Sequence, residues 1–130
     1  LEKLQHDNFG LMYDTCHGQM LGVIGARQQG EKELVKDQIE LINMFSGRIN
    51  HIHLIDSDNT CHKDADGNDE TSAHPPFGDG ILDFDQIVPL LAKENVGHDW
   101  WTVDLCFWPE AWDATEKCKT ALDGLVSKYG

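Results

Sequence analysis

Three short apolar segments, separated by amphipathic stretches, constrain the fold of this chain more than any other feature. The apolar segments are residues 9–14, 49–55 and 100–106, each of a length typical of a buried strand. Apolar side chains recur near the 3.6-residue helical period over residues 31–46, 84–95 and 111–128. Strand and helix therefore alternate with no hairpin signal between them. This order predicts an α/β fold of parallel strands joined by helical crossovers.

The segments between these elements are expected to be loops. Residues 18–30 are rich in glycine, which predicts a loop with or without a helical turn. Residues 56–82 are polar and rich in Gly and Asp, and a loop of this length is usually functional or mobile. Three parallel strands alone leave both sheet edges open. We therefore expect a second chain or upstream strands to complete the sheet.

The charge balance limits the class of partner. Ten basic residues stand against 23 acidic ones, giving a formal net charge of −13. Nucleic acid is a poor partner because its recognition depends on neutralising phosphates with Lys and Arg; a neutral small molecule, with or without a cation, is favoured. The four cysteines are scattered without CxxC spacing, which is typical of free thiols in a reducing compartment. With no apolar run of membrane-spanning length, we expect a cytoplasmic protein that does not contact membranes.

Carboxylate and imidazole groups occur where each predicted strand ends. The carboxyl ends of parallel strands meet at one edge of a sheet, so groups that are far apart in the sequence converge there. Mixed carboxylate and imidazole ligands suit a divalent metal ion. The candidates are Asp14 and His17 after the first strand, His51, His53 and Asp56 around the end of the second, and Asp104 at the third.

Strand geometry distinguishes among these candidates. Side chains alternate between the two faces of a strand, so His51 and His53 share a face and Ile52 lies opposite. His53 is nearer the carboxyl end and is the better ligand candidate, whereas His51 is deeper and suits a supporting or packing role. A strand-end aspartate alone is usually a helix cap or a turn former, an interpretation that fits Asp56 and Asp83. The joint occurrence of such groups at all three strand ends favours a site.

Other residues are candidates for contact with a substrate. His74 precedes two prolines that stiffen the segment 73–84, from which its ring can reach the mouth of the sheet. Phe107 and Trp108 directly follow the third strand, where aromatic faces suit sugar rings, although core packing or an interface explains them equally well. Arg27, in the glycine-rich segment, either binds a substrate oxygen or balances the acidic charge nearby.

Taken together, these segments resemble the xylose-isomerase-like TIM-barrel superfamily, which includes sugar isomerases, epimerases and repair nucleases of the endonuclease IV type. The motifs that carry the resemblance are "YDTCH" (13–17), "INHIHLIDSD" (49–58), "HPPFGDGILDFDQI" (74–87) and "WWTVDLCF" (100–107). The resemblance covers nearly the whole chain. It implies that the chain is the C-terminal portion, the last three βα units, of a (β/α)8 TIM barrel, a fold that typically needs about 250 residues.

The resemblance also assigns roles to residues. It implies Asp14, His53 and Asp104 as metal ligands, with Asp104 standing where the family usually has Glu. His17 matches a histidine that contacts substrate in the epimerases or a second metal in the nucleases. His74 matches a position that binds an additional metal in the nucleases, but their partner aspartate two residues earlier is Ser72 here.

The function implied is that of a divalent-metal-dependent sugar isomerase or epimerase, using Mn, Mg, Co or Zn. Proton transfer on a keto sugar or polyol would proceed through an enediolate, with Asp104 as one of two catalytic carboxylates and His17 holding a substrate oxygen. The family's other catalytic Glu lies on an upstream strand, so we expect this chain alone to be inactive. One alternative is a metal-dependent phosphodiesterase of the endonuclease IV type, against which the charge and Ser72 count. Another is a non-catalytic barrel fragment. On any of these interpretations we expect a homo-oligomer or association with the upstream half of the barrel.

Overall fold

A parallel sheet forms the centre of the chain. The computed structural model describes residues 6, 9–23, 35–94 and 100–130. Within these residues, β1 (Leu11–Asp14), β2 (Ile49–Leu54) and β5 (Trp101–Val103) form a sheet in the order β1-β2-β5, and both pairings are parallel. Each strand lies within the range predicted for it but is shorter. The predicted α/β class with parallel strands is confirmed.

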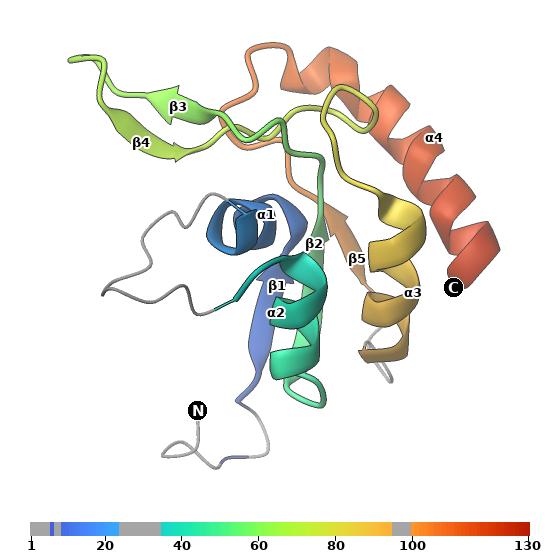
Figure 1. Cartoon of the computed structure of the whole chain (residues 1–130). Coiled ribbons are helices and arrows are strands. Elements are labelled where there is room, and N and C mark those ends of the chain that lie inside the picture. Colours follow the sequence, from blue (N-terminus) through green and yellow to red (C-terminus); the bar gives the residue numbers. More distant parts are fainter. Residues whose placement is uncertain (1–5, 7–8, 24–34, 95–99) are drawn as a thin grey trace.

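Helices follow the strands and cover one side of the sheet (Figure 1). They are α1 (Thr15–Val23), α2 (Gln38–Met44), α3 (Phe84–Glu94) and α4 (Ala111–Tyr129). The helix predicted over 31–46 begins only at Gln38, where the side chain of Asp37 accepts a hydrogen bond from the Glu40 amide; residues 31–34 lie outside the described residues. Helix α3 continues through Pro89 despite the missing amide, because its apolar face is buried.

The segment 18–30, predicted as a loop with or without a helical turn, is helical in its described part, because α1 starts at Thr15 and continues to Val23. Asp14 caps this helix, because its Oδ1 accepts a hydrogen bond of 2.9 Å from the His17 amide. Gly18 suggested a loop but serves close packing instead. A Cβ atom there would lie 2.2 Å from Tyr13 Oη, so only glycine lets helix and strand approach this closely.

The long polar segment 56–82 also contains structure that we did not predict. Strands β3 (Cys61–Lys63) and β4 (Asp69–Ser72) pair antiparallel, so the expectation of no hairpin is wrong. The turn between them is held by Asp64, whose Oδ1 accepts from the Asp66 and Asn68 amides, and by Gly67 at φ +85°. The hairpin projects beyond the carboxyl ends of the parallel strands (Figure 1).

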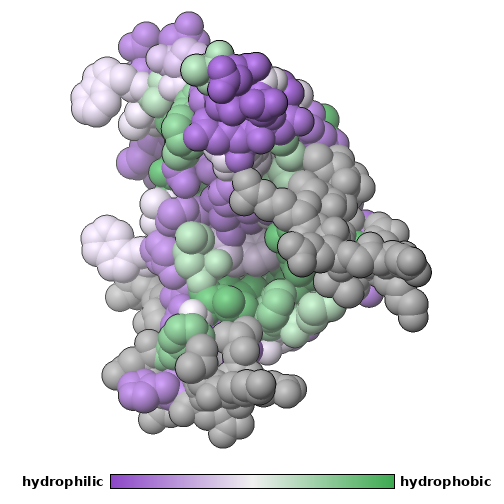
Figure 2. Space-filling view, turned by 90° about the vertical axis from the view of Figure 1, so that its left-hand side faces the viewer, coloured by the Kyte–Doolittle hydropathy of each residue, from purple (hydrophilic) through white to green (hydrophobic). Residues whose placement is uncertain are grey.

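The hydrophobic core lies between the sheet and its helices. Ile52 and Leu54 of β2 are fully buried in a cluster with Ile42 of α2, and with Val88 and Leu91 of α3. Viewed from the left-hand side of Figure 1, hydrophobic residues gather over the middle of the molecule and hydrophilic ones over its upper part (Figure 2). No helix in the described residues combines the length and hydropathy needed to cross a membrane.

Asp56 fixes the segment that joins the hairpin to α3. Its side chain is 2% exposed, and its two oxygens accept hydrogen bonds from the amides of Ser57, Gly78, Gly80 and Leu82. The interpretation of Asp56 as a turn former is therefore confirmed. Gly80 must be glycine for this arrangement, since a Cβ atom would lie 2.3 Å from Asp56 Oδ1.

Candidate functional site

Strand register brings the three predicted metal ligands together. Asp14 of β1 is the register partner of His53 in β2, and His53 is in turn the partner of Thr102 in β5. Asp104 comes two residues after Thr102 and so lies on the same side of the chain. His53 Nδ1 lies 3.2 Å from Asp104 Oδ2 and 3.7 Å from Asp14 Oδ2. One ligand atom from each of these residues lies within 4.8 Å of the other two.

Asp14 uses its two carboxylate oxygens differently. Oδ1 caps α1, whereas Oδ2 is buried and has no hydrogen-bond partner within the described residues. Its separation from His53 Nδ1 is too long for a hydrogen bond. A buried carboxylate oxygen without a donor is costly, and a divalent cation would satisfy it. The donor set of two carboxylates and one imidazole therefore fits a divalent metal ion.

A second cluster shares Asp14 with the first. Ligand atoms of Asp14, His17 and His74 also lie within 4.8 Å of one another. His74 is 2% exposed, and its Nδ1 lies 3.1 Å from the backbone carbonyl oxygen of Asp104. Since a carbonyl only accepts, Nδ1 is the donor, and in the neutral ring the lone pair therefore lies on Nε2. That Nε2 atom is buried without a partner in the described part of the chain, which suits a cation or a donor group of a ligand.

His17 is held by a residue that sequence reasoning considered only as a departure from the family. Its Nδ1 lies 2.6 Å from the hydroxyl oxygen of Ser72 at the end of β4. Its ring meets that of His74 edge to face, with centroids 5.0 Å apart. His51 lies outside both clusters, half-buried with its Nε2 3.4 Å from Thr102 Oγ1. No sequence signal identified Ser72, because β4 itself was not predicted.

Two of the other predicted substrate contacts, Phe107 and Trp108, lie outside both clusters. Phe107, at φ +60°, is 54% exposed and stacks on His62 of β3 with ring centroids 4.7 Å apart. Trp108 is half-buried in the turn before α4, where its amide donates to the Leu105 carbonyl. Arg27 lies outside the described residues. The substrate-binding roles of these three residues stay predictions.

Comparison with known proteins identifies the family of the chain. The model of the family described as xylose isomerase-like TIM barrel matches residues 1–124. The chain belongs to this family. Searches of the curated proteins and of the solved structures found no match. The family includes sugar isomerases and epimerases together with AP endonucleases, and its members are mostly enzymes that commonly bind divalent metals.

Membership of this TIM-barrel family explains the position of the clusters. The β1-β2-β5 sheet is part of such a barrel, and TIM-barrel active sites lie at the carboxyl ends of the strands. Asp14, His53 and Asp104 lie at that end of the sheet. The prediction of a partial TIM barrel is therefore confirmed.

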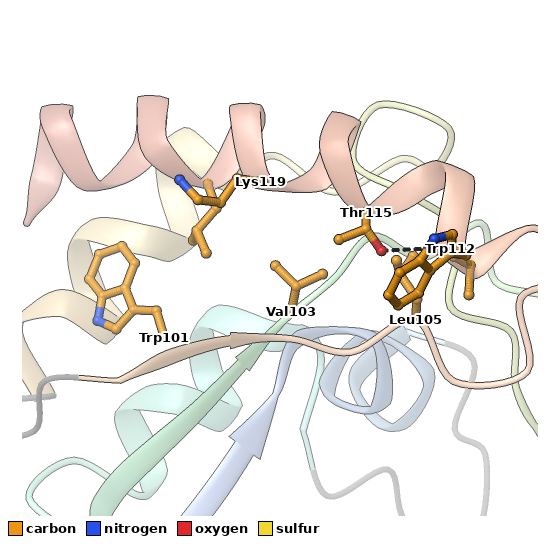
Figure 3. A pocket seen from close by; sticks show the side chains of 8 residues that line it. Trp101, Val103, Leu105, Trp112, Thr115 and Lys119 are labelled. Atoms are coloured by element: carbon orange, nitrogen blue, oxygen red, sulfur yellow. Dashed lines mark hydrogen bonds between the residues drawn. The ribbon is translucent and has the colours of Figure 1, made fainter.

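Two hollows flank the edge strands of this partial barrel. One, of about 210 Å³, runs along β1 and is lined by Asp14 and His17 together with apolar residues such as Met12 and Phe45. The other, of about 400 Å³, lies between β5 and α4 (Figure 3). Its walls are mainly apolar: Trp101 lies toward one end, Trp112 toward the other. Of these two hollows, the one along β1 reaches residues of the candidate site.

The cysteines near the strand ends are poor nucleophiles. Cys16 is fully buried, with its Sγ 3.0 Å from the Ala73 carbonyl oxygen. Burial raises the pKa of Cys16 to about 11, so the thiol is protonated at neutral pH. Burial followed by the charges of Asp104 and Asp14 also raises the pKa of Cys106. The candidate chemistry therefore belongs to the carboxylates and imidazoles.

Proposed function

We propose that this chain is the C-terminal part of a divalent-metal-dependent sugar isomerase or epimerase that acts on a keto sugar or polyol. The observation that carries the proposal is the convergence of Asp14, His53 and Asp104 from three neighbouring parallel strands, with a buried carboxylate oxygen that lacks a donor among the described residues. Family membership supports it, because sugar isomerases and epimerases are among the members.

Each residue of the site has a distinct task in this proposal. Asp14, His53 and Asp104 would hold the ion, which when bound supplies a Lewis acid that acidifies a C–H next to a carbonyl. The Asp104 side chain is 29% exposed, against 4% for Asp14, so Asp104 is the carboxylate better placed to exchange a proton with a substrate. His17 would hold a substrate oxygen. The second catalytic carboxylate would come from a strand outside this sheet.

Charge supports a small uncharged substrate. The net charge of −13 disfavours a polyanion, whereas a sugar or polyol is neutral and carries hydroxyl groups that suit imidazole and carboxylate partners. The β1 hollow of about 210 Å³ is of a size to admit part of such a molecule beside Asp14 and His17.

Metal binding tests the proposal directly. Calorimetric titration of the purified chain with Mn²⁺, Mg²⁺, Co²⁺ and Zn²⁺ should give stoichiometric binding of at least one ion. Asp14→Asn is the sharper variant at that position, because asparagine keeps the Oδ1 cap of α1 while removing the charge. Asp14→Asn and His53→Ala should each weaken binding by at least tenfold, whereas Asp58→Asn, an exposed control, should not change it. A wild-type chain that binds none of the four ions would refute the metal centre.

One observation favours a second candidate function. The Asp14, His17 and His74 cluster offers ligands for another cation, as a metal-dependent phosphodiesterase of the endonuclease IV type would require. Ser72 lies at this cluster and contributes no negative charge to it. Binding of duplex DNA containing an abasic site, measured at several salt concentrations, separates the two functions. Salt-dependent binding would favour the phosphodiesterase, and we expect none.

A further inference from the structure

Ser72 and His17 come from different elements and meet in a short hydrogen bond at the edge of the site. Ser72 ends β4 of the hairpin and is 5% exposed, whereas His17 lies in the first turn of α1. The distance from Ser72 Oγ to His17 Nδ1 is 2.6 Å. The His17 amide is held at the same time by Asp14 Oδ1. Backbone and ring of His17 are therefore both anchored, and only its Nε2 is left for a ligand.

The two histidines of this cluster differ in the partner of Nδ1. His74 faces the carbonyl oxygen of Asp104, which only accepts, so the lone pair of the neutral His74 ring lies on Nε2. His17 faces a hydroxyl, which both donates and accepts. When Ser72 donates to Nδ1, His17 carries its proton on Nε2 and donates to a ligand. When Ser72 accepts, Nε2 offers a lone pair.

The hydroxyl also leaves the cluster with little negative charge. Asp14 is the carboxylate of the Asp14, His17 and His74 group, and its Oδ1 already accepts the His17 amide. A cation at this cluster would therefore share Asp14 with the His53 and Asp104 group. Asp104, whose Oδ2 lies 3.7 Å from His74 Nδ1, also belongs to that group, so the cluster offers such a cation no carboxylate of its own. A sugar hydroxyl or carbonyl needs no such charge. A histidine that can either donate or accept a hydrogen bond also suits a sugar hydroxyl or carbonyl.

We propose that Ser72 is a positioning residue that presents Nε2 of His17 to an oxygen of the sugar or polyol, and that His17 is not a metal ligand. The inference rests on the proposed function for its substrate class and deepens it. It assigns the His53 side of Asp14 to the metal ion and the His17 side to the substrate. Ser72 acts only through His17, so its removal should weaken sugar binding without removing the ion.

The test compares Ser72→Ala and Ser72→Thr with the wild-type chain. Ser46→Ala is the matched control, because the Ser46 hydroxyl also makes a 2.6 Å hydrogen bond, which it donates to Glu94. Ser46 lies between the end of α2 and the start of β2, away from the carboxyl end of β2 where the candidate site lies. Three readouts are needed: Zn²⁺ affinity by calorimetry, the ¹⁵N shifts of the His17 ring by NMR, and D-fructose affinity of the zinc-loaded chain by NMR titration. Circular dichroism verifies that each variant is folded.

We expect Ser72→Ala to change the His17 ring shifts, to leave Zn²⁺ affinity within about twofold, and to weaken D-fructose binding by about five- to tenfold. Ser72→Thr should restore binding, and Ser46→Ala should change none of the three readouts. Loss of Zn²⁺ in Ser72→Ala comparable to that in His53→Ala would overturn the inference, because His17 would then be a ligand. Unchanged ring shifts or unchanged D-fructose affinity in Ser72→Ala, or no D-fructose binding by the wild type, would also overturn it. Failure of the wild type to bind Zn²⁺ would refute the proposed metal centre, and the ring shifts measured without zinc would still decide the role of Ser72.

Discussion

Replacing Asp56 tests how the chain holds the segment that leads from His74 to α3. Asp56 is buried, and each of its oxygens accepts two backbone amides. Oδ1 accepts from Ser57 and Leu82, and Oδ2 accepts from Gly78 and Gly80. The substitution Asp56→Asn keeps the shape of the side chain but replaces one of these oxygens by an amide group. Whichever way the amide turns, two backbone N–H donors then face another donor, and three of the four amides concerned form part-buried bonds.

The expected cost follows from those two donors. A buried donor left without an acceptor costs about 1–3 kcal/mol, and part-buried donors cost less, so Asp56→Asn should lower the free energy of unfolding by about 2–4 kcal/mol. This is a large share of the roughly 5–15 kcal/mol that stabilises a typical domain. With a urea m-value of about 2 kcal/mol/M, the unfolding midpoint should fall by about 1–2 M.

Urea unfolding followed by far-UV circular dichroism measures this change. Asp58→Asn is the matched control, because Asp58 is exposed and uses Oδ1 alone to accept both of its hydrogen bonds from Thr60. Asparagine preserves that oxygen, so the control should change stability by less than about 0.5 kcal/mol. If Asp56→Asn also stays within that limit, the four amide bonds do not hold this segment and the reasoning is refuted.

Three further perturbations have a predicted sign. Gly80→Ala should destabilise the chain by about 1–3 kcal/mol, because the new Cβ would lie 2.5 Å from the Ser57 carbonyl oxygen. Gly124→Ala in α4 meets nothing within 4 Å and should stabilise the chain by about 0.5–1 kcal/mol, so urea midpoints that move in the same direction for both variants would contradict this prediction. Tyr13→Phe should lower the free energy of unfolding by about 1–2 kcal/mol, and so lower Tm, because it leaves the Gln38 oxygen without its buried donor at 3.1 Å. No change in Tm would show that water replaces the hydroxyl. Hydrogen bonds from the Ser46 hydroxyl and the Gly47 amide lower the pKa of Glu94 in the folded chain. The contribution of Glu94 to the free energy of unfolding is therefore present above the ordinary glutamate pKa of about 4.3, and it is lost as the pH falls through the lower folded value. Glu94→Gln should therefore flatten the dependence of Tm on pH in that acidic range, and an unchanged slope would contradict the assignment.

The sheet and its ligand-bearing ends were predictable because their signals are local. Asp14, His53 and Asp104 each occur at the end of an apolar segment, and alternation along a strand fixes the side to which each residue points. Once the strands are parallel, their carboxyl ends meet without further information. The observed register of Asp14 with His53 is what this reasoning requires.

The rest of the site depended on contacts that no local pattern encodes. The hairpin that carries Ser72 consists of short polar strands, which lack the alternation that marks a half-buried strand. Helix α1 was missed because Gly18 has a low helix propensity, and its role in packing against Tyr13 appears only in three dimensions. The contact of His17 with Ser72 was therefore beyond sequence reasoning, although His17, Asp14 and His74 were identified as candidates.

Asp14 shows why a structural and a functional interpretation of one residue need not compete. The sequence allowed Asp14 to be a helix cap or a metal ligand. In the structure Oδ1 caps α1, and Oδ2 is left for the ligand role that we propose. The bond from the His17 amide to Oδ1 restricts the side chain to one orientation, so Oδ2 is presented to His53 without further ordering of the carboxylate. Because the same bond starts α1, the helix that carries His17 is positioned relative to the candidate metal centre by the ligand itself. Asp14→Asn keeps the cap of α1 but removes the charge. It should therefore preserve the position of His17 while weakening the binding of the metal ion. The capping bond thus couples the two sides of the site that we assign to the cation and to the sugar.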